Sequence, residues 1–235
     1  MKKSVLVLAI AATFAPVLAQ AEAGDWVVRL RATNINPSES SKLGETTDKA
    51  ALGASAAALY GSSTANLEVD SNTIPELDIS YYVTKNIALE LILALGSKHD
   101  VNVSTTGLVN PKLGEVNLLP PTLTAQWHFM PDQTFDPYVG AGVTYARAMD
   151  NGLTANATAS GNGVHPIRID RNNWGVALQA GFDINLTDRW LVNFDVKKIW
   201  IDTDVKLNFA GQGYKKIDSL DIDPLVVSVG IGKKF

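Results

Sequence analysis

Apolar residues in this chain recur at every second position, in eight separate segments spread along the sequence. The last segment illustrates the pattern. Its alternating apolar residues are Leu225, Val227, Val229, Ile231 and, at the terminus, Phe235, and most residues between them are small or polar. A period of two places successive side chains on opposite faces of a β-strand. The sequence therefore predicts an all-β fold.

The connections between the eight predicted strands alternate between long and short. The strands cover residues 24–36, a stretch ending at residue 83, 87–95, 119–129, 136–147, 174–184, 190–197 and 225–235. The long connections are polar, at 37–67, 97–114, 148–172 and 202–218, whereas tight turns occupy 84–86, 130–134 and 185–189. This arrangement is typical of an antiparallel up-and-down transmembrane barrel of the bacterial outer membrane, with long extracellular loops and short periplasmic turns.

No segment beyond the amino-terminal region can cross a membrane as a helix. A spanning helix needs about 20 apolar residues, and the longest apolar run, residues 87–95, is interrupted by Glu90. A sheet can span lipid only when it closes on itself, because open edges leave backbone groups unpaired. Alternation alone leaves one alternative, a soluble barrel or sandwich whose apolar faces turn inward.

Aromatic residues gather at both ends of the predicted strands, which favours the membrane barrel over a soluble one. The ends near the long connections carry Tyr145, Trp174 and Trp200. The opposite ends carry Trp26, Tyr81, Trp127, Phe129, Phe182, Trp190 and Phe235. Aromatic rings prefer the two interfaces of a bilayer, so we interpret these residues as a pair of girdles.

Residues 1–21 have the features of a secretory signal peptide. Lys2 and Lys3 precede an apolar stretch at 4–18, and small residues permit cleavage after Ala21 or Ala23. The apolar stretch is too short for a spanning helix. We therefore expect one mature barrel domain over residues 24–235, located in the outer membrane, with Phe235 read by the outer-membrane assembly machinery.

Composition and spacing exclude several other classes of function. The chain has no cysteine and a net charge of −4, which argues against disulfides, thiol chemistry and nucleic-acid binding. The three histidines, His99, His128 and His165, lack the spacing of metal ligands. Ser80 and His128 lie two strands apart without clear oxyanion donors, so we expect neither an enzyme nor a cofactor.

The face of the predicted strands that turns into the barrel is polar and charged. An eight-stranded barrel is only wide enough for its own side chains, and opposite charges packed there should pair because an unpaired buried charge is costly. We expect a polar plug that fills the periplasmic half and blocks a continuous water pore. The polar plug comprises Arg29, Arg31, Asp78, Glu90, Gln126, His128, Gln179, Asp183, Asn193, Asp195 and Lys197.

Three prolines fall towards the outer parts of the second and fourth predicted strands. Pro75, Pro120 and Pro121 cannot donate hydrogen bonds to a β-ladder. One interpretation is that strands two to four open laterally there, so that an apolar solute leaves through the wall into lipid. The other is that the prolines only mark loop boundaries or bulges.

Several short motifs, in order along the chain, resemble those of the OmpW family. They are LPPTLTAQW at 119–127, PYVGAGV at 137–143, NWG at 173–175, WLVN at 190–193, DV at 195–196, IDT at 201–203 and DP at 223–224. Together they cover nearly all of the expected mature chain. The sequence departs from the family in its first long connection, where the Ala-rich run at 49–60 is longer than the family pattern.

The resemblance implies an eight-stranded outer-membrane barrel that takes up small hydrophobic molecules. The nearest alternative branch is the AlkL type, associated with alkane uptake. Trp174 matches the family's aromatic at the start of strand six, which implies that it lines the upper opening for the solute, whereas strand parity turns it towards lipid as a girdle residue.

The sequence also leads to expectations about partners and to an alternative function. We expect a monomer in contact with outer-membrane lipid and with small hydrophobic solutes. The alternative function is a structural or receptor barrel whose loops bind phage, toxins or host surfaces without transport.

Overall fold

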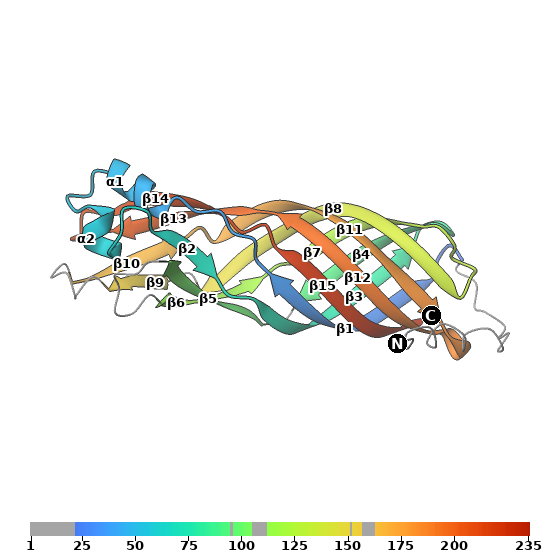
Figure 1. Cartoon of the computed structure of the whole chain (residues 1–235). Coiled ribbons are helices and arrows are strands. Elements are labelled where there is room, and N and C mark those ends of the chain that lie inside the picture. Colours follow the sequence, from blue (N-terminus) through green and yellow to red (C-terminus); the bar gives the residue numbers. More distant parts are fainter. Residues whose placement is uncertain (1–21, 95, 105–111, 151, 157–162) are drawn as a thin grey trace, which may run out of the picture.

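The computed structural model describes residues 22–94, 96–104, 112–150, 152–156 and 163–235, so the expected signal peptide at 1–21 lies outside the described residues. Within them, eight antiparallel strands close into a barrel (Figure 1). In order around the wall they are β1 (Trp26–Asn36), β3 (Asn72–Tyr82), β4 (Ile87–Ala94), β7 (Thr122–His128), β8 (Phe135–Asp150), β11 (Asn172–Asn185), β12 (Trp190–Trp200) and β15 (Leu225–Lys234).

The barrel closes between its first and last strands. β15 pairs with β1 from Val27↔Lys234 to Asn36↔Leu225. Beyond the last pair of the ladder, the Phe235 N–H donates to the Trp26 carbonyl oxygen at 2.8 Å, and the Trp26 N–H donates back at 3.3 Å. The predicted eight-stranded up-and-down barrel is therefore confirmed, with β15 as the strand that seals it.

The alternation along each strand sorts apolar side chains outward and polar side chains inward. On β1, Leu30 is 60% exposed whereas the neighbouring Arg29 is fully buried. This is the reverse of a soluble protein, in which arginine is almost never fully buried unless paired. A lumen filled by polar side chains and an apolar outer surface is the pattern of a barrel whose solvent is lipid.

The aromatic residues lie in two outward-facing groups. At one end, the rings of Trp26 and Tyr81 on paired strands lie 4.9 Å apart. At the other end, Tyr145 and Trp174 are cross-strand partners with ring centroids 4.7 Å apart. The two pairs mark the two interfaces of the membrane.

The short connections all lie at the end of the barrel where β1 begins and β15 ends. Residues 83–86 join β3 to β4, and 129–134 join β7 to β8. The turn between β11 and β12 contains the 3₁₀ turn η2 (Thr187–Arg189), in which Asp188 and Arg189 both have positive φ. Short turns on this side agree with the predicted periplasmic end.

The four long connections are not simple polar loops, which corrects the expectation drawn from the sequence. At the far end of the barrel (Figure 1) they fold into an outer extension made of two sheets and two short helices. The first sheet adds β6 (Lys112–Leu119), β5 (Ser97–Ser104) and β2 (Asn66–Val69) to the upper part of β8. The second contains β9 (Gly152–Asn156), β10 (Val164–Ile169), β13 (Asp202–Asn208) and β14 (Tyr214–Asp221).

The helices of the outer extension come from the first long connection. They are α1 (Leu43–Lys49) and α2 (Ala56–Tyr60), so part of the Ala-rich run at 49–60 is helical. Ser55 caps α2 because its hydroxyl accepts a hydrogen bond from the Ala58 N–H at 3.2 Å, and Gly61 ends it with φ of +76°. Neither helix has the length and apolarity needed to cross a membrane.

An apolar core holds the outer extension together. Its buried members come from α1, α2 and both sheets, and they include Leu43, Leu59, Leu67, Val101, Val116, Leu153, Ile167, Leu207 and Ile217. On the strands these residues alternate mainly with polar residues, such as Asn66, Asp100, Thr154 and Lys206, which explains the polar composition of the long connections. Burial of one face makes the extension a continuation of the barrel wall beyond the membrane.

Candidate solute chamber above a polar plug

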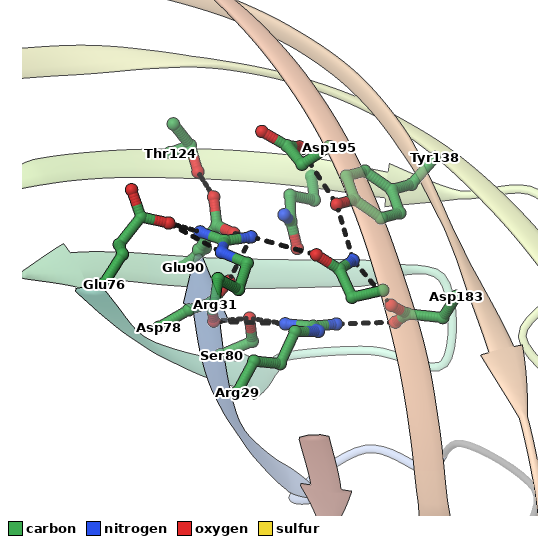
Figure 2. A network of polar contacts seen from close by, with 12 residues as sticks. Arg29, Arg31, Glu76, Asp78, Ser80, Glu90, Thr124, Tyr138, Asp183 and Asp195 are labelled. Carbon is green, nitrogen blue, oxygen red and sulfur yellow. Dashed lines mark hydrogen bonds and ion pairs between the residues drawn. The ribbon is translucent and has the colours of Figure 1, made fainter. Parts of the chain in front are cut away.

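The polar plug is organised around two buried arginines on β1. Arg29 donates to Asp78 Oδ1 at 3.1 Å and to the Ser80 hydroxyl at 2.7 Å, both on the neighbouring strand β3. Its other nitrogen, Nη2, donates to Asp183 Oδ2 at 2.6 Å on β11, across the lumen. Figure 2 shows the guanidinium of Arg29 lying between these partners.

Arg31 contacts three carboxylates, one of which, Asp78, it shares with Arg29. It pairs with Glu76 Oε1 at 2.6 Å, with Asp78 Oδ2 at 2.8 Å and with Glu90 Oε1 at 3.4 Å. Its Nη1 also donates to Asn193 Oδ1 at 3.3 Å, on β12. Because the partners stand on β3, β4 and β12, Arg31 ties together strands that are not neighbours in the wall (Figure 2).

The remaining members of the polar plug complete the network from the other side of the barrel. Glu90 Oε2 accepts from Thr124 at 2.6 Å and from the Gln179 amide at 2.9 Å. Lys197 Nζ lies 3.4 Å from Asp195 Oδ1. Each of these charged groups therefore has an opposite charge or a hydrogen-bond donor beside it, which is the condition for burying it.

Every predicted member of the polar plug is buried on an inward face. Besides Ser80 and Thr124, two larger residues that the predicted polar plug left out belong to the same network. Glu76 pairs with Arg31, and the Tyr138 hydroxyl donates to Asp195 Oδ2 at 3.0 Å. Both stand at inward positions of their strands, so strand parity already contained the signal that identifies them.

Small residues on β15 make room for the two arginines. Gly232 lies opposite Arg29 in the β1–β15 register, and Gly230 lies opposite Arg31. A Cβ at Gly230 would lie 2.2 Å from the Leu30 carbonyl oxygen and 2.7 Å from Arg31 Cγ. The interior of an eight-stranded barrel is just wide enough for its side chains, so the two glycines leave the space that the arginine side chains occupy.

A histidine and two carboxylates form a cluster at the periplasmic end of the lumen. His128 Nδ1 lies 2.7 Å from Asp136 Oδ2, and a ligand atom of Asp183 lies within 4.8 Å of both side chains. The geometry can accommodate a cation, but Arg29 and Asn193 already donate to the two oxygens of Asp183. A metal ion there would have to displace a guanidinium.

Towards the extracellular side the lumen changes from polar to apolar on four strands. On β1 the last inward polar residue is Thr33, and the next inward residue is Ile35. The same change occurs from Thr144 to Ala146 on β8, from Lys197 to Ile199 on β12 and from Ser228 to Val226 on β15. Two hydrogen bonds between hydroxyl groups lie at this boundary, Thr33–Ser228 at 2.8 Å and Thr122–Thr144 at 2.9 Å.

Above this boundary lies a cavity of about 100 Å³, which we call the apolar chamber. Its walls come from the upper barrel, through residues such as Ile35, Ala146 and Ile199, and from the outer extension, through residues such as Val101 and Leu153. An engineered cavity of about 150 Å³ with a similar lining binds benzene in another protein. The apolar chamber therefore has the size and chemistry of a site for a small apolar molecule or part of one.

The three prolines lie beside the last described pairs of the two ladders of β4. The β4–β7 ladder ends at Ile92↔Thr122, next to Pro121, and the last pair of the β3–β4 ladder among the described residues is Glu76↔Ala94, next to Pro75. Pro120 and Pro121 also separate β6 from β7, so they mark a strand boundary as well. Pro120 lines the apolar chamber.

Trp174 does not line the apolar chamber. Its side chain is 68% exposed on the outer face of β11 and packs on Tyr145. The residue before it, Asn173, lines the chamber instead, because successive residues of a strand face opposite sides. The position of Trp174 thus agrees with strand parity and not with the role at the solute opening that the resemblance implied.

The model of the OmpW family matches residues 22–235. The chain belongs to the OmpW family. As an OmpW-family protein it is an outer-membrane β-barrel embedded in the lipid bilayer, and this family is not one of enzymes.

Two relatives and one solved structure illustrate the OmpW-family match. The chain is 33% identical over 239 residues to outer membrane protein W of Vibrio cholerae, with 100% of both chains covered. It is 26% identical over 216 residues to the dibenzothiophene metabolism operon protein PahQ of Pseudomonas aeruginosa, covering 92% of this chain and 90% of that one. The crystal structure of OprG from Pseudomonas aeruginosa matches with a TM-score of 0.73 and 31% identity, covering 92% of this chain and 98% of that chain.

Proposed function

We propose that this OmpW-family barrel takes up small hydrophobic molecules, which enter from the outer extension, occupy the apolar chamber and leave sideways into the membrane. The observation that carries the proposal is the vertical division of the lumen. An apolar chamber lies on the extracellular side, and the polar plug lies directly below it. An apolar solute that binds in the chamber is therefore unlike the polar and charged side chains that fill the lumen below it.

The polar plug makes straight passage to the periplasm costly. An apolar molecule moving down the lumen would have to separate ion pairs such as Arg29–Asp183 at 2.6 Å and Arg31–Glu76 at 2.6 Å. Removing one partner from a buried pair costs about 3–5 kcal/mol. Transfer of the solute from water into lipid, in contrast, is favourable by about 0.8 kcal/mol for each CH₂ group.

Lateral exit needs a weak point in the wall, and the prolines supply a candidate. Pro120 and Pro121 lie just beyond the last pair of the β4–β7 ladder, and Pro75 lies beside the last described pair of the β3–β4 ladder. Separating strands beyond the end of a ladder breaks fewer backbone hydrogen bonds than separating them within it. We therefore propose that the exit opens beside the extracellular end of β4, between β4 and its neighbours β3 and β7.

The name of one relative supports an apolar solute. PahQ is named for a dibenzothiophene metabolism operon, and dibenzothiophene is a compact aromatic molecule without a charged group. A solute of that kind is of the class that an apolar cavity accepts.

Reconstitution of the mature barrel tests the proposed function. Ion conductance is measured in planar bilayers, and transfer of n-decane from an external emulsion into the lipid of proteoliposomes is measured in parallel. We expect faster n-decane transfer than in protein-free vesicles together with little steady conductance. Large, steady ionic conductance without n-decane transfer would overturn the proposal.

Two further proposals concern the assembly of the barrel and its oligomeric state. We propose that Phe235 is read by the outer-membrane assembly machinery, which its 60% exposed side chain permits. We also propose that the barrel works as a monomer, since one chain closes the sheet by pairing its own first and last strands.

A further inference from the structure

Besides Thr144 and Asn173 of the barrel, three buried polar side chains of the outer extension line the mostly apolar chamber. Ser97 and His99 project from β5 and are 1% and 5% exposed, and Thr203 projects from β13 and is 3% exposed. A cavity that served alkanes alone would gain nothing from these groups, because burying a polar group without a partner is unfavourable. Their hydrogen bonds indicate what they can still bind.

The Ser97–His99 pair leaves the serine oxygen as an acceptor. His99 Nδ1 lies 2.8 Å from the carbonyl oxygen of Asp70, and because a carbonyl only accepts, the hydrogen of a neutral ring is on Nδ1. His99 Nε2 is then an acceptor, so the Ser97 hydroxyl at 2.7 Å donates to it. The remaining lone pairs of Ser97 Oγ can accept a hydrogen bond from a molecule in the chamber.

Thr203 offers the complementary group. Its Oγ1 is buried and has no hydrogen-bond partner among the described residues. Buried hydroxyl groups of folded proteins nearly always have a partner, so an isolated one that lines a cavity points to a ligand. The Thr203 hydroxyl can both donate and accept, and its hydrogen is free to bind an oxygen atom of that ligand.

We propose that the apolar chamber selects small apolar molecules that carry one hydroxyl group, that is, alcohols and phenols in preference to plain hydrocarbons of the same size. A ligand hydroxyl can donate to Ser97 Oγ or accept from Thr203 Oγ1, so each of these groups can recognise it. The rest of the ligand lies against the apolar walls, such as Val101 and Ile201. This inference rests on the proposed function, because it names the solute class of the same chamber.

The test compares two probes with the same number of non-hydrogen atoms, pentan-1-ol and n-hexane. Binding of each to the mature barrel in lipid nanodiscs is followed by NMR of methyl groups that line the chamber. In T203V, pentan-1-ol binding is expected to weaken about five-fold, the worth of one hydrogen bond, while n-hexane binding stays the same or strengthens. S97A is expected to act in the same direction from the other strand.

T47V is the matched control, because Thr47 is buried in α1 and does not line the chamber. It should leave the ratio of the two dissociation constants unchanged. If T203V and S97A, with folded spectra, also leave this ratio unchanged, recognition of the hydroxyl is wrong while uptake of apolar solutes stands. If neither probe perturbs the chamber methyl groups of the unaltered protein, the proposed function itself fails.

Discussion

Arg29 and Asp183 form an ion pair across the lumen, with Arg29 Nη2 at 2.6 Å from Asp183 Oδ2. Their strands, β1 and β11, are not neighbours in the barrel wall, so the pair braces the barrel across its lumen. Both side chains are buried, and Asp78 and Ser80 accept hydrogen bonds from Nη1 of the same guanidinium. Stability of the barrel and closure of its lumen therefore depend on the same contacts.

Replacing Arg29 with methionine should destabilise the barrel strongly. The change leaves Asp78 and Asp183 without their shared cation, and we expect a loss of about 3–5 kcal/mol of unfolding free energy. Urea unfolding in lipid vesicles, followed by tryptophan fluorescence, measures it. Lys98→Met is the control, because the exposed Lys98–Glu115 pair at 3.2 Å contributes little. Equal stability of the two variants would contradict the bracing role.

Replacing Gly230 with alanine should also destabilise the barrel, because a Cβ at this position would lie 2.2 Å from the Leu30 carbonyl oxygen. Overpacking of this kind costs about 1–3 kcal/mol. Gly152→Ala is the matched control, since the nearest atom to a Cβ there is 3.8 Å away. Urea unfolding in the same vesicles compares the two, and a Gly230 variant as stable as the control would show that the lumen has spare room.

Filling the apolar chamber should stop transfer of apolar solutes. Ala146 lines the chamber from β8, and a phenylalanine there would occupy much of the roughly 100 Å³ available. We expect Ala146→Phe to lower n-decane transfer at least ten-fold in proteoliposomes. Ala141→Phe, on the lipid-facing side of the same strand, should leave transfer unchanged. Wild-type transfer by the Ala146 variant would place the solute path elsewhere.

Replacing both Pro120 and Pro121 with valine should slow lateral exit. Valine restores N–H donors and favours extended pairing, so the β4–β7 ladder can continue past Ile92↔Thr122. We expect slower transfer of a long-chain alkane in proteoliposomes. Pro166→Val on β10, remote from this ladder, is the control. Unchanged uptake by the double variant would leave the two prolines as boundary markers only.

The outer extension should loosen at alkaline pH through Tyr60 in α2. Burial raises the pKa of Tyr60 to about 12, above its ordinary value of 10.0. Because the pKa in the folded state is the higher one, the contribution of Tyr60 to stability is complete below pH 10 and is lost as the pH rises through 12. The absorbance at 295 nm of the protein minus that of Tyr60→Phe should rise near pH 12. A rise near pH 10 in the folded protein would contradict the burial of this phenol.

Strand parity allowed the barrel and much of the lumen to be predicted. The alternation of Leu30 with Arg29 and Arg31 assigns one side of β1 to lipid and the other to the lumen. Membrane physics then leaves closure as the only solution for such a sheet. The same alternation places Glu76 and Tyr138 on the lumen side of their strands, although the predicted polar plug did not include them.

The outer extension could not be predicted in the same way. Its strands are short and carry polar residues on one face, so segments such as β5 and β13 have the composition of loops. Only packing of Val101, Leu153 and Leu207 against one another shows that they bury a core. Local composition does not report contacts between segments that are far apart in the sequence.

By itself, then, the sequence determined which side chains face lipid and which face the lumen, because a period of two is a local property of the chain. The tertiary structure decided which inward residues meet. It brings Arg29 to Asp183 from opposite walls, and it brings Ser97 and Thr203 from separate sheets to one cavity. Register, closure and packing of distant segments determine these meetings, and no local pattern encodes them.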